Sequence, residues 1–155
     1  MVVIDVLATL PMFAEFDRTS LEPVADVVRS CFFDEGEVVF RRGDVGEGMF
    51  FIQSGRVDVI WEIFPHRKFI LTSIDPGDFF GEMAILENST RSATVMAVET
   101  LDTLGLSRDN FYQLIHERPY SSLLLIKAIG KKLSSRLRLL NEHLLFTEAT
   151  LKMLD

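Results

Sequence analysis

The chain has 155 residues, of which 48% are apolar and 10% aromatic, enough for one domain with a buried core and too many for a disordered segment. Sixteen Lys and Arg stand against twenty-three Asp and Glu, and the formal charge of −7 argues against a nucleic-acid partner. One cysteine, Cys31, excludes an intrachain disulfide, which fits a reducing compartment. With no apolar run as long as a membrane span and no basic signal-peptide region, the sequence predicts a cytoplasmic protein.

Residues 1–30 are predicted to be helical. Ile4, Leu7 and Leu10 follow helical spacing, and Pro11 ends the run. Residues 19–22 (TSLE) have the form of a capping box, which predicts a second helix with Thr19 as its cap.

Residues 31–107 are predicted to form strands, because short β-rich runs are separated by glycine and proline, with seven of the nine glycines between 36 and 81. Many short strands at close spacing are typical of a closed barrel or jelly roll. Ser54 and Gly55 separate FFIQ from RVDVI, and this turn predicts a hairpin. Cys31 begins a predicted strand and is expected to be a small buried hydrophobic side chain.

Residues 108–155 are predicted to be helical again, with Ser107 capping a short helix and Pro119 beginning a long one. A heptad seam is formed by Leu133, Leu137, Leu140 and Leu144. Gly130 and Thr147 occupy two further seam positions and weaken it. The seam predicts self-association; the alternative is that this helix only packs back on the barrel.

Residues 79–95 (FFGEMAILENSTRSATV) contain a candidate anion site. A ligand can approach the backbone closely at Gly81, and the helical turn after it would present free N–H groups. Arg91 supplies a permanent planar charge suited to phosphate, and Ser92 adds a hydroxyl. Glu82 would repel a bare phosphate but accept a hydrogen bond from a sugar hydroxyl. The segment therefore predicts a site for a nucleotide with a single negative charge.

FGEMAIL followed by RSATV resembles the phosphate-binding cassette of the cyclic nucleotide-binding domain family, which includes catabolite activator proteins, regulatory subunits of cyclic-AMP-dependent protein kinase and cyclic-nucleotide-gated channels. LPMFAEFDRTSLEPVA, GEVVFRRGDVGEGMFFIQSGRVDV and PGDFFGE resemble the segments that precede the cassette, so the resemblance covers nearly the whole chain. It implies a mainly β fold with flanking helices, a β-roll (double-stranded β-helix or jelly-roll barrel), N-terminal helices and a long C-terminal helix. One domain is expected over 1–155, with helices in 1–30, the β-roll in 31–107, the cassette in 80–95 and helices in 108–155. Many bacterial members continue into a helix-turn-helix, but this chain stops at Asp155, so no DNA-binding domain is expected.

The resemblance also implies the roles of site residues. Glu82 would bind the ribose 2′-hydroxyl, and Arg91 would pair with the cyclic phosphate. Backbone N–H groups near Gly81, Ala84 and Ser92 would complete the phosphate cradle. The base would lie against Val59, Leu71 and Thr72. The C-terminal helix would close over the base as a lid at Arg136 and Leu137, with Leu140 and Asn141 close to these two. The full set of expected ligand-binding residues is Gly81, Glu82, Met83, Ala84, Arg91, Ser92, Ala93, Val59, Leu71, Thr72, Phe80, Arg136 and Leu137.

The resemblance implies a non-catalytic sensor that needs no metal or cofactor. The heptad seam adds the expectation of a homodimer through the C-terminal helix. In this family, Thr at the position of Ser92 accompanies better cyclic GMP (cGMP) binding, so Ser92 favours cyclic AMP (cAMP). One alternative is the same fold with a degenerate pocket, acting only as a dimerisation or interaction module. Another is a metal-dependent jelly-roll enzyme, disfavoured by the wide separation of His66, His116 and His143. A cyclic dinucleotide is disfavoured by Glu82, which suits a free ribose hydroxyl.

Overall fold

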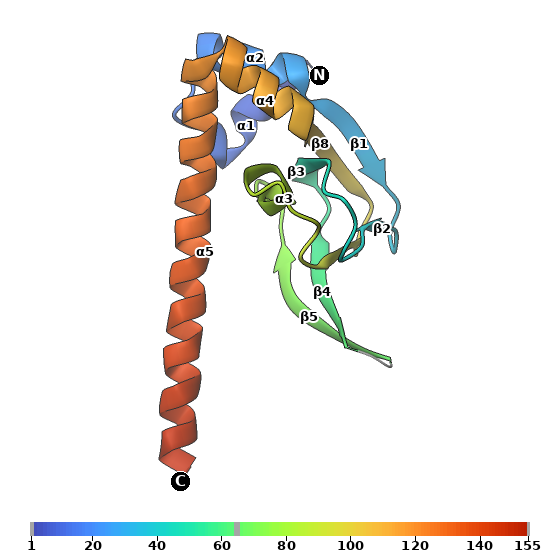
Figure 1. Ribbon diagram of the computed structural model, residues 1–155, viewed down its shortest axis with the longest axis vertical. Helices are drawn as coiled ribbons and strands as arrows, with labels where there is room; N and C mark the ends of the chain where they lie inside the picture. The colour runs from blue at the N-terminus through green and yellow to red at the C-terminus, as the bar shows by residue number, and fades with distance from the viewer. Residues whose placement is uncertain (1, 64–65, 155) are drawn as a thin grey trace.

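The computed structural model describes residues 2–63 and 66–154 (Figure 1). The N-terminal helices are α1 (Val3–Thr9), the 3-10 helix η1 (Pro11–Phe13) and α2 (Arg18–Val27). The strands are β1 (Arg29–Phe33), β2 (Val38–Phe40), β3 (Gly48–Ser54), β4 (Val57–Ile63), β5 (Arg67–Ile74), β6 (Phe79–Phe80), β7 (Thr94–Ala97) and β8 (Leu101–Ser107). A short helix, α3 (Glu82–Leu86), interrupts the strands, and the chain ends in α4 (Arg108–Glu117) and α5 (Pro119–Leu154). The mainly β fold with flanking helices is confirmed.

The strands form two antiparallel four-stranded sheets with the orders β1-β8-β3-β6 and β2-β7-β4-β5. The apolar side chains between the sheets are Ile52, Val57, Ile74, Phe80, Val95, Ala97 and Leu101. Two sheets that share an inner apolar layer make the expected β-roll.

The turn at Gly55 is not a hairpin, contrary to the sequence-based prediction. β3 pairs with β6 and β8, while β4 pairs with β5 and β7, so the chain crosses here from one sheet to the other. Gly55 has φ +83°, and a Cβ on it would collide with the carbonyl oxygen of Thr100. The sequence shows strand, turn and strand, but the turn residues alone do not specify which strands pair.

Two further local predictions were wrong. The N-cap of α2 is Asp17, whose carboxylate accepts a hydrogen bond from the Ser20 N–H at 2.8 Å, so Thr19 lies inside the first turn. Cys31 is only partly buried because β1 is an edge strand of its sheet. The cap at Ser107 is confirmed, since its hydroxyl accepts from the Asn110 N–H at 3.1 Å.

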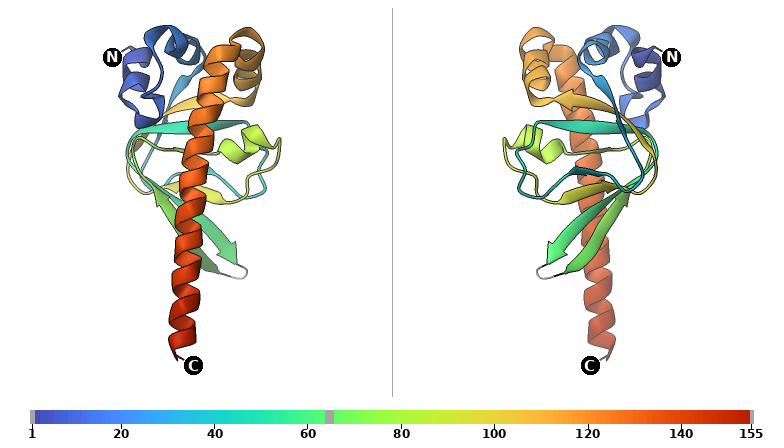
Figure 2. Two further views of the ribbon diagram at one scale, coloured as in Figure 1. Left: turned by 90° about the vertical axis from the view of Figure 1, so that its left-hand side faces the viewer. Right: turned by 90° about the vertical axis from the view of Figure 1, so that its right-hand side faces the viewer.

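The larger apolar core lies between the helices and the β3–β8 face of the roll. Phe13 of η1 packs edge-on against Phe51 of β3, with ring centroids 5.3 Å apart. Leu125 and Ile129 of α5 are buried in the same core. The C-terminal end of α5 runs on past the barrel in all three ribbon views (Figures 1 and 2). Among the described helices, none is long and apolar enough to cross a bilayer.

Candidate functional site

A cavity of about 490 Å³ opens between the β-roll, α3 and α5. Its lining residues are Phe40, Val59, Leu71, Thr72, Ser73, Ile74, Asp78, Phe80, Gly81, Glu82, Met83, Ala84, Arg91, Ser92, Ala93, Val95, Lys132, Arg136, Leu139, Leu140 and His143. Apolar strand residues therefore form one wall, and the charged side chains come from the turn before β6, from α3, from the loop before β7 and from α5.

Gly81 allows the chain to turn sharply from β6 into α3. It is the N-cap of α3, with φ +84° and ψ 6°, a left-handed conformation that favours glycine. A Cβ at this position would lie 2.8 Å from Nη1 of Arg91 and 3.1 Å from the Gly48 carbonyl oxygen. Gly81 therefore lets the start of α3 and Arg91 approach each other closely.

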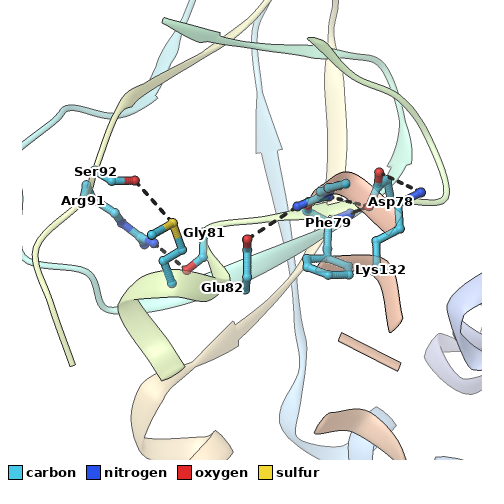
Figure 3. A network of polar contacts seen from close by, with 9 residues as sticks. Asp78, Phe79, Gly81, Glu82, Arg91, Ser92 and Lys132 are labelled. Atoms are coloured by element: carbon cyan, nitrogen blue, oxygen red, sulfur yellow. Dashed lines mark hydrogen bonds and ion pairs between the residues drawn. The ribbon is translucent and has the colours of Figure 1, made fainter. Parts of the chain in front are cut away.

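Arg91 is a buried cation, only 7% exposed. Its Nη1 donates to the Gly81 carbonyl at 2.9 Å, its Nη2 donates to the Gly48 carbonyl at 2.6 Å, and its guanidinium lies 3.9 Å from the centre of the Phe40 ring. Figure 3 shows the side chain reaching towards Gly81. Within the described part of the chain, no carboxylate lies within 4.0 Å of this guanidinium, and its buried Nε has no hydrogen-bond acceptor. Burial, followed by the charge of Arg108, lowers the pKa of Arg91.

Glu82 is the first residue of α3 and is also 7% exposed. Burial raises the pKa of the Glu82 carboxyl, an effect opposed by a hydrogen bond from its own backbone N–H and by the charge of Arg136. Nη1 of Arg136 lies 3.5 Å from Oε1 of Glu82. The carboxylate thus retains acceptor capacity towards the cavity.

A cluster of charges joins α5 to the rim of the cavity. Nη2 of Arg136 donates to Oδ1 of Asp78 and to the Phe79 carbonyl, both at 2.6 Å, and Nζ of Lys132 lies 3.2 Å from Oδ2 of Asp78. Figure 3 shows Lys132 and Asp78 facing each other beside Phe79. This cluster fixes the part of α5 that faces Glu82.

Most of the residues expected from the sequence lie on this one cavity. They are Gly81, Glu82, Met83, Ala84, Arg91, Ser92, Ala93, Val59, Leu71, Thr72, Phe80 and Arg136. Leu137 does not line it and is 59% exposed, and Asn141 is also absent from the lining. Successive helical residues are rotated by roughly 100°, so Arg136, Leu140 and His143 share a face of α5 that Leu137 does not.

Several lining residues were not expected from the sequence. Phe40 lies on β2, far from the cassette in sequence, whereas Asp78 lies just before the cassette. Lys132, Leu139 and His143 lie on α5. The spacing of Lys132, Arg136, Leu139 and His143 at steps of four, three and four is the signal that could have identified this face of the helix.

Within residues 2–63 and 66–154, no three His, Cys, Asp or Glu side chains gather as metal ligands would. His143 lines the cavity without another histidine.

Comparison with known proteins shows the family. A family model described as the cyclic nucleotide-binding domain matches residues 31–118, more than half of the chain. The cAMP-dependent protein kinase regulatory subunit of Schizosaccharomyces pombe is 27% identical over 109 residues, which span 70% of this chain but only 26% of that protein.

Solved structures agree. The Thermus thermophilus catabolite activator protein superposes with a TM-score of 0.73 at 27% identity, covering 86% of this chain and 61% of that one. The regulatory domain of Toxoplasma gondii PKA, crystallised with cAMP, gives a TM-score of 0.63 at 30% identity, covering 72% of this chain and 42% of that one. The chain belongs to the cyclic nucleotide-binding domain family.

Proposed function

We propose that residues 1–155 act as one non-catalytic, cytoplasmic sensor domain that binds a 3′,5′-cyclic mononucleotide in this cavity, with cAMP preferred to cGMP. The observation that carries the proposal is Arg91, a buried guanidinium with no carboxylate partner among the described residues. A buried charge without a counter-charge is costly, and a phosphate from outside the chain would supply one.

Glu82 supports a ribose next to that phosphate. In a 3′,5′-cyclic nucleotide the 2′-hydroxyl and the phosphate-bearing 3′-oxygen sit on adjacent carbons. Glu82 directly follows Gly81, whose carbonyl accepts from Arg91. One ligand of this class therefore brings an anion and a hydroxyl donor to two neighbouring positions of the cavity, as the pair Arg91 and Glu82 requires.

The base would lie between the barrel wall and α5. Val59, Leu71 and Thr72 line one side, and Leu139 and Leu140 line the other. Ser92 supports cAMP over cGMP only through its residue type in the family. The T. gondii structure, which contains cAMP, adds support from a relative.

The exposed seam of α5 supports a homodimer. The seam residues Leu137, Leu140 and Leu144 are at least 59% exposed, whereas Leu133, the fourth seam leucine, packs against the core of its own chain. Gly130 lies on the same seam, and a Cβ there would meet nothing within 4 Å, so the packing of this chain gives no reason for glycine. Glycine inside a helix costs about 1 kcal/mol relative to alanine. A second α5 crossing close to Gly130 would account for it.

The experiment is a calorimetric titration of nucleotide-free protein with cAMP, cGMP and cyclic di-GMP, with sedimentation velocity on the same samples. Saturable binding of a cyclic mononucleotide, one per chain, is expected. If neither cAMP nor cGMP binds, the proposal of a cyclic mononucleotide sensor is wrong, whether or not cyclic di-GMP binds. A dimer without binding would favour the alternative of an interaction module, and a monomer at all concentrations would refute the proposed dimer.

A further inference from the structure

Arg108, the first residue of α4, reaches back from the helical end of the molecule to α3. Its Nη2 donates to the Ala84 carbonyl at 2.6 Å, and its backbone N–H donates to the Glu47 carbonyl at 2.7 Å. Its side chain is partly buried, and its Nε is fully buried without an acceptor in the described structure. Arg108 therefore joins α4, α3 and the loop before β3.

α3 needs such an anchor. A helix of five residues is not stable by itself, and its last carbonyls lack backbone partners. The Ala84 carbonyl is one of these, because α3 ends at Leu86. On another side Ala84 lies against Gly46, where any Cβ would collide with the Ala84 Cβ. Arg108 and Gly46 thus hold the same residue of α3.

The position of α3 matters for Arg91. The carbonyl that accepts from Nη1 of Arg91 belongs to Gly81, the N-cap of α3. A shift of α3 would therefore move both Arg91 and Glu82, the two groups assigned to the ligand. Burial and then the charge of Arg108 are the main causes that lower the pKa of Arg91, so the two arginines repel each other. The hydrogen bond from Arg108 to the Ala84 carbonyl is present despite this repulsion.

We propose that Arg108 is a positioning residue: by holding the Ala84 carbonyl it keeps α3 and Arg91 in the arrangement that receives the ligand phosphate. The proposal rests on the proposed function. Supporting groups of this kind act by keeping binding groups within a narrow range of geometry.

The test uses the full chain with Arg108→Met, which removes the hydrogen bond, and Gly46→Ala, which displaces Ala84 without changing charge. Arg118→Met is the matched control, because Arg118 is an exposed arginine at the other end of α4. Amide hydrogen exchange of residues 79–90 is measured without ligand, and cAMP affinity is measured by calorimetry at about 50 mM and about 500 mM NaCl.

We expect Arg108→Met and Gly46→Ala each to speed amide exchange in α3 by about tenfold. Each should also weaken cAMP binding by about tenfold at both salt concentrations. Arg118→Met should stay within about twofold of wild type in both measurements. Unchanged α3 exchange in Arg108→Met would overturn the proposal, as would an equal rise of exchange over the whole chain. A loss of affinity that disappears at high salt would show that Arg108 acts only through its charge. A wild-type chain that binds no cyclic mononucleotide would refute the proposed function, whereas the ligand-free exchange would still decide whether Arg108 holds α3.

Discussion

Replacing Arg91 with methionine tests the proposed phosphate site most directly. Methionine keeps part of the apolar stem over Phe40 but removes the charge and both donors. A hydrogen bond to a charged group contributes about 1.5–3 kcal/mol, and stranding one partner of a buried ion pair costs about 3–5 kcal/mol. We expect a loss of binding free energy of roughly 2–4 kcal/mol, because water retained near the phosphate would reduce the larger figure. This corresponds to about 30- to 700-fold weaker binding.

The assay is calorimetric titration with cAMP, and circular dichroism shows whether each variant is folded. Arg42→Met is the matched control, because Arg42 also lies over an aromatic ring, 3.8 Å from the centre of Trp61, but does not line the cavity. The control should bind within about twofold of wild type. If folded Arg91→Met also binds within about twofold of wild type, the phosphate does not lie at Arg91 and the assignment of the cavity is wrong.

Three further changes test the other parts of the site. Burial raises the pKa of the Glu82 carboxyl above its ordinary value of 4.5, so the folded protein binds a proton at Glu82 more tightly than the unfolded chain does. The stability of the wild-type protein should therefore fall as the pH rises from 4.5 through the raised pKa. Glu82→Gln should therefore be more stable to urea than wild type at pH 7, without this advantage at pH 4. It should also bind cAMP more weakly. A Glu82→Gln variant less stable than wild type at pH 7 would contradict the reasoning. Arg136→Met should lower the free energy of unfolding by about 1–2 kcal/mol, measured by urea titration, because it breaks the 2.6 Å contact with Asp78, and an unchanged midpoint would exclude that role. Leu144→Glu should weaken the proposed dimer at least about tenfold, as measured by sedimentation velocity. The control is Leu145→Glu, because Leu145 is equally exposed but lies off the seam, and this variant should leave the dimer unchanged. Equal effects of the two substitutions would argue against the seam.

The cassette could be predicted from the sequence because its chemistry is local. Gly81, Glu82 and Arg91 lie within eleven residues, and the close approach at the glycine, the helical turn after it and the arginine charge were each expected from residue type. The class of fold followed in the same way from the density of short strands and glycine turns. The helix beginning at Pro119 was also predicted from local signals.

Features that depend on tertiary placement were not predictable in this way. Gly55 resembles a hairpin turn, but sheet pairing is decided by which apolar faces meet across the barrel, and the chain changes sheets there. The rotation of α5 about its own axis is set by the burial of Leu125 and Ile129 in the helical core. That rotation brings Arg136 and Leu140 to the cavity and leaves Leu137 exposed, a result that the heptad pattern alone does not give.

The charges around Glu82 limit how a ligand would act on α5. Arg136 approaches Glu82 at 3.5 Å, but its shorter contacts, at 2.6 Å, are with Asp78 and the Phe79 carbonyl. A ribose hydroxyl that took Glu82 would therefore compete only with the longest of the three contacts. A ligand shifts a conformational equilibrium only by its difference in affinity for the two states. Binding at Glu82 would then leave α5 anchored at Asp78, and additional contacts of the base with Leu140 would favour a closed lid over a released helix.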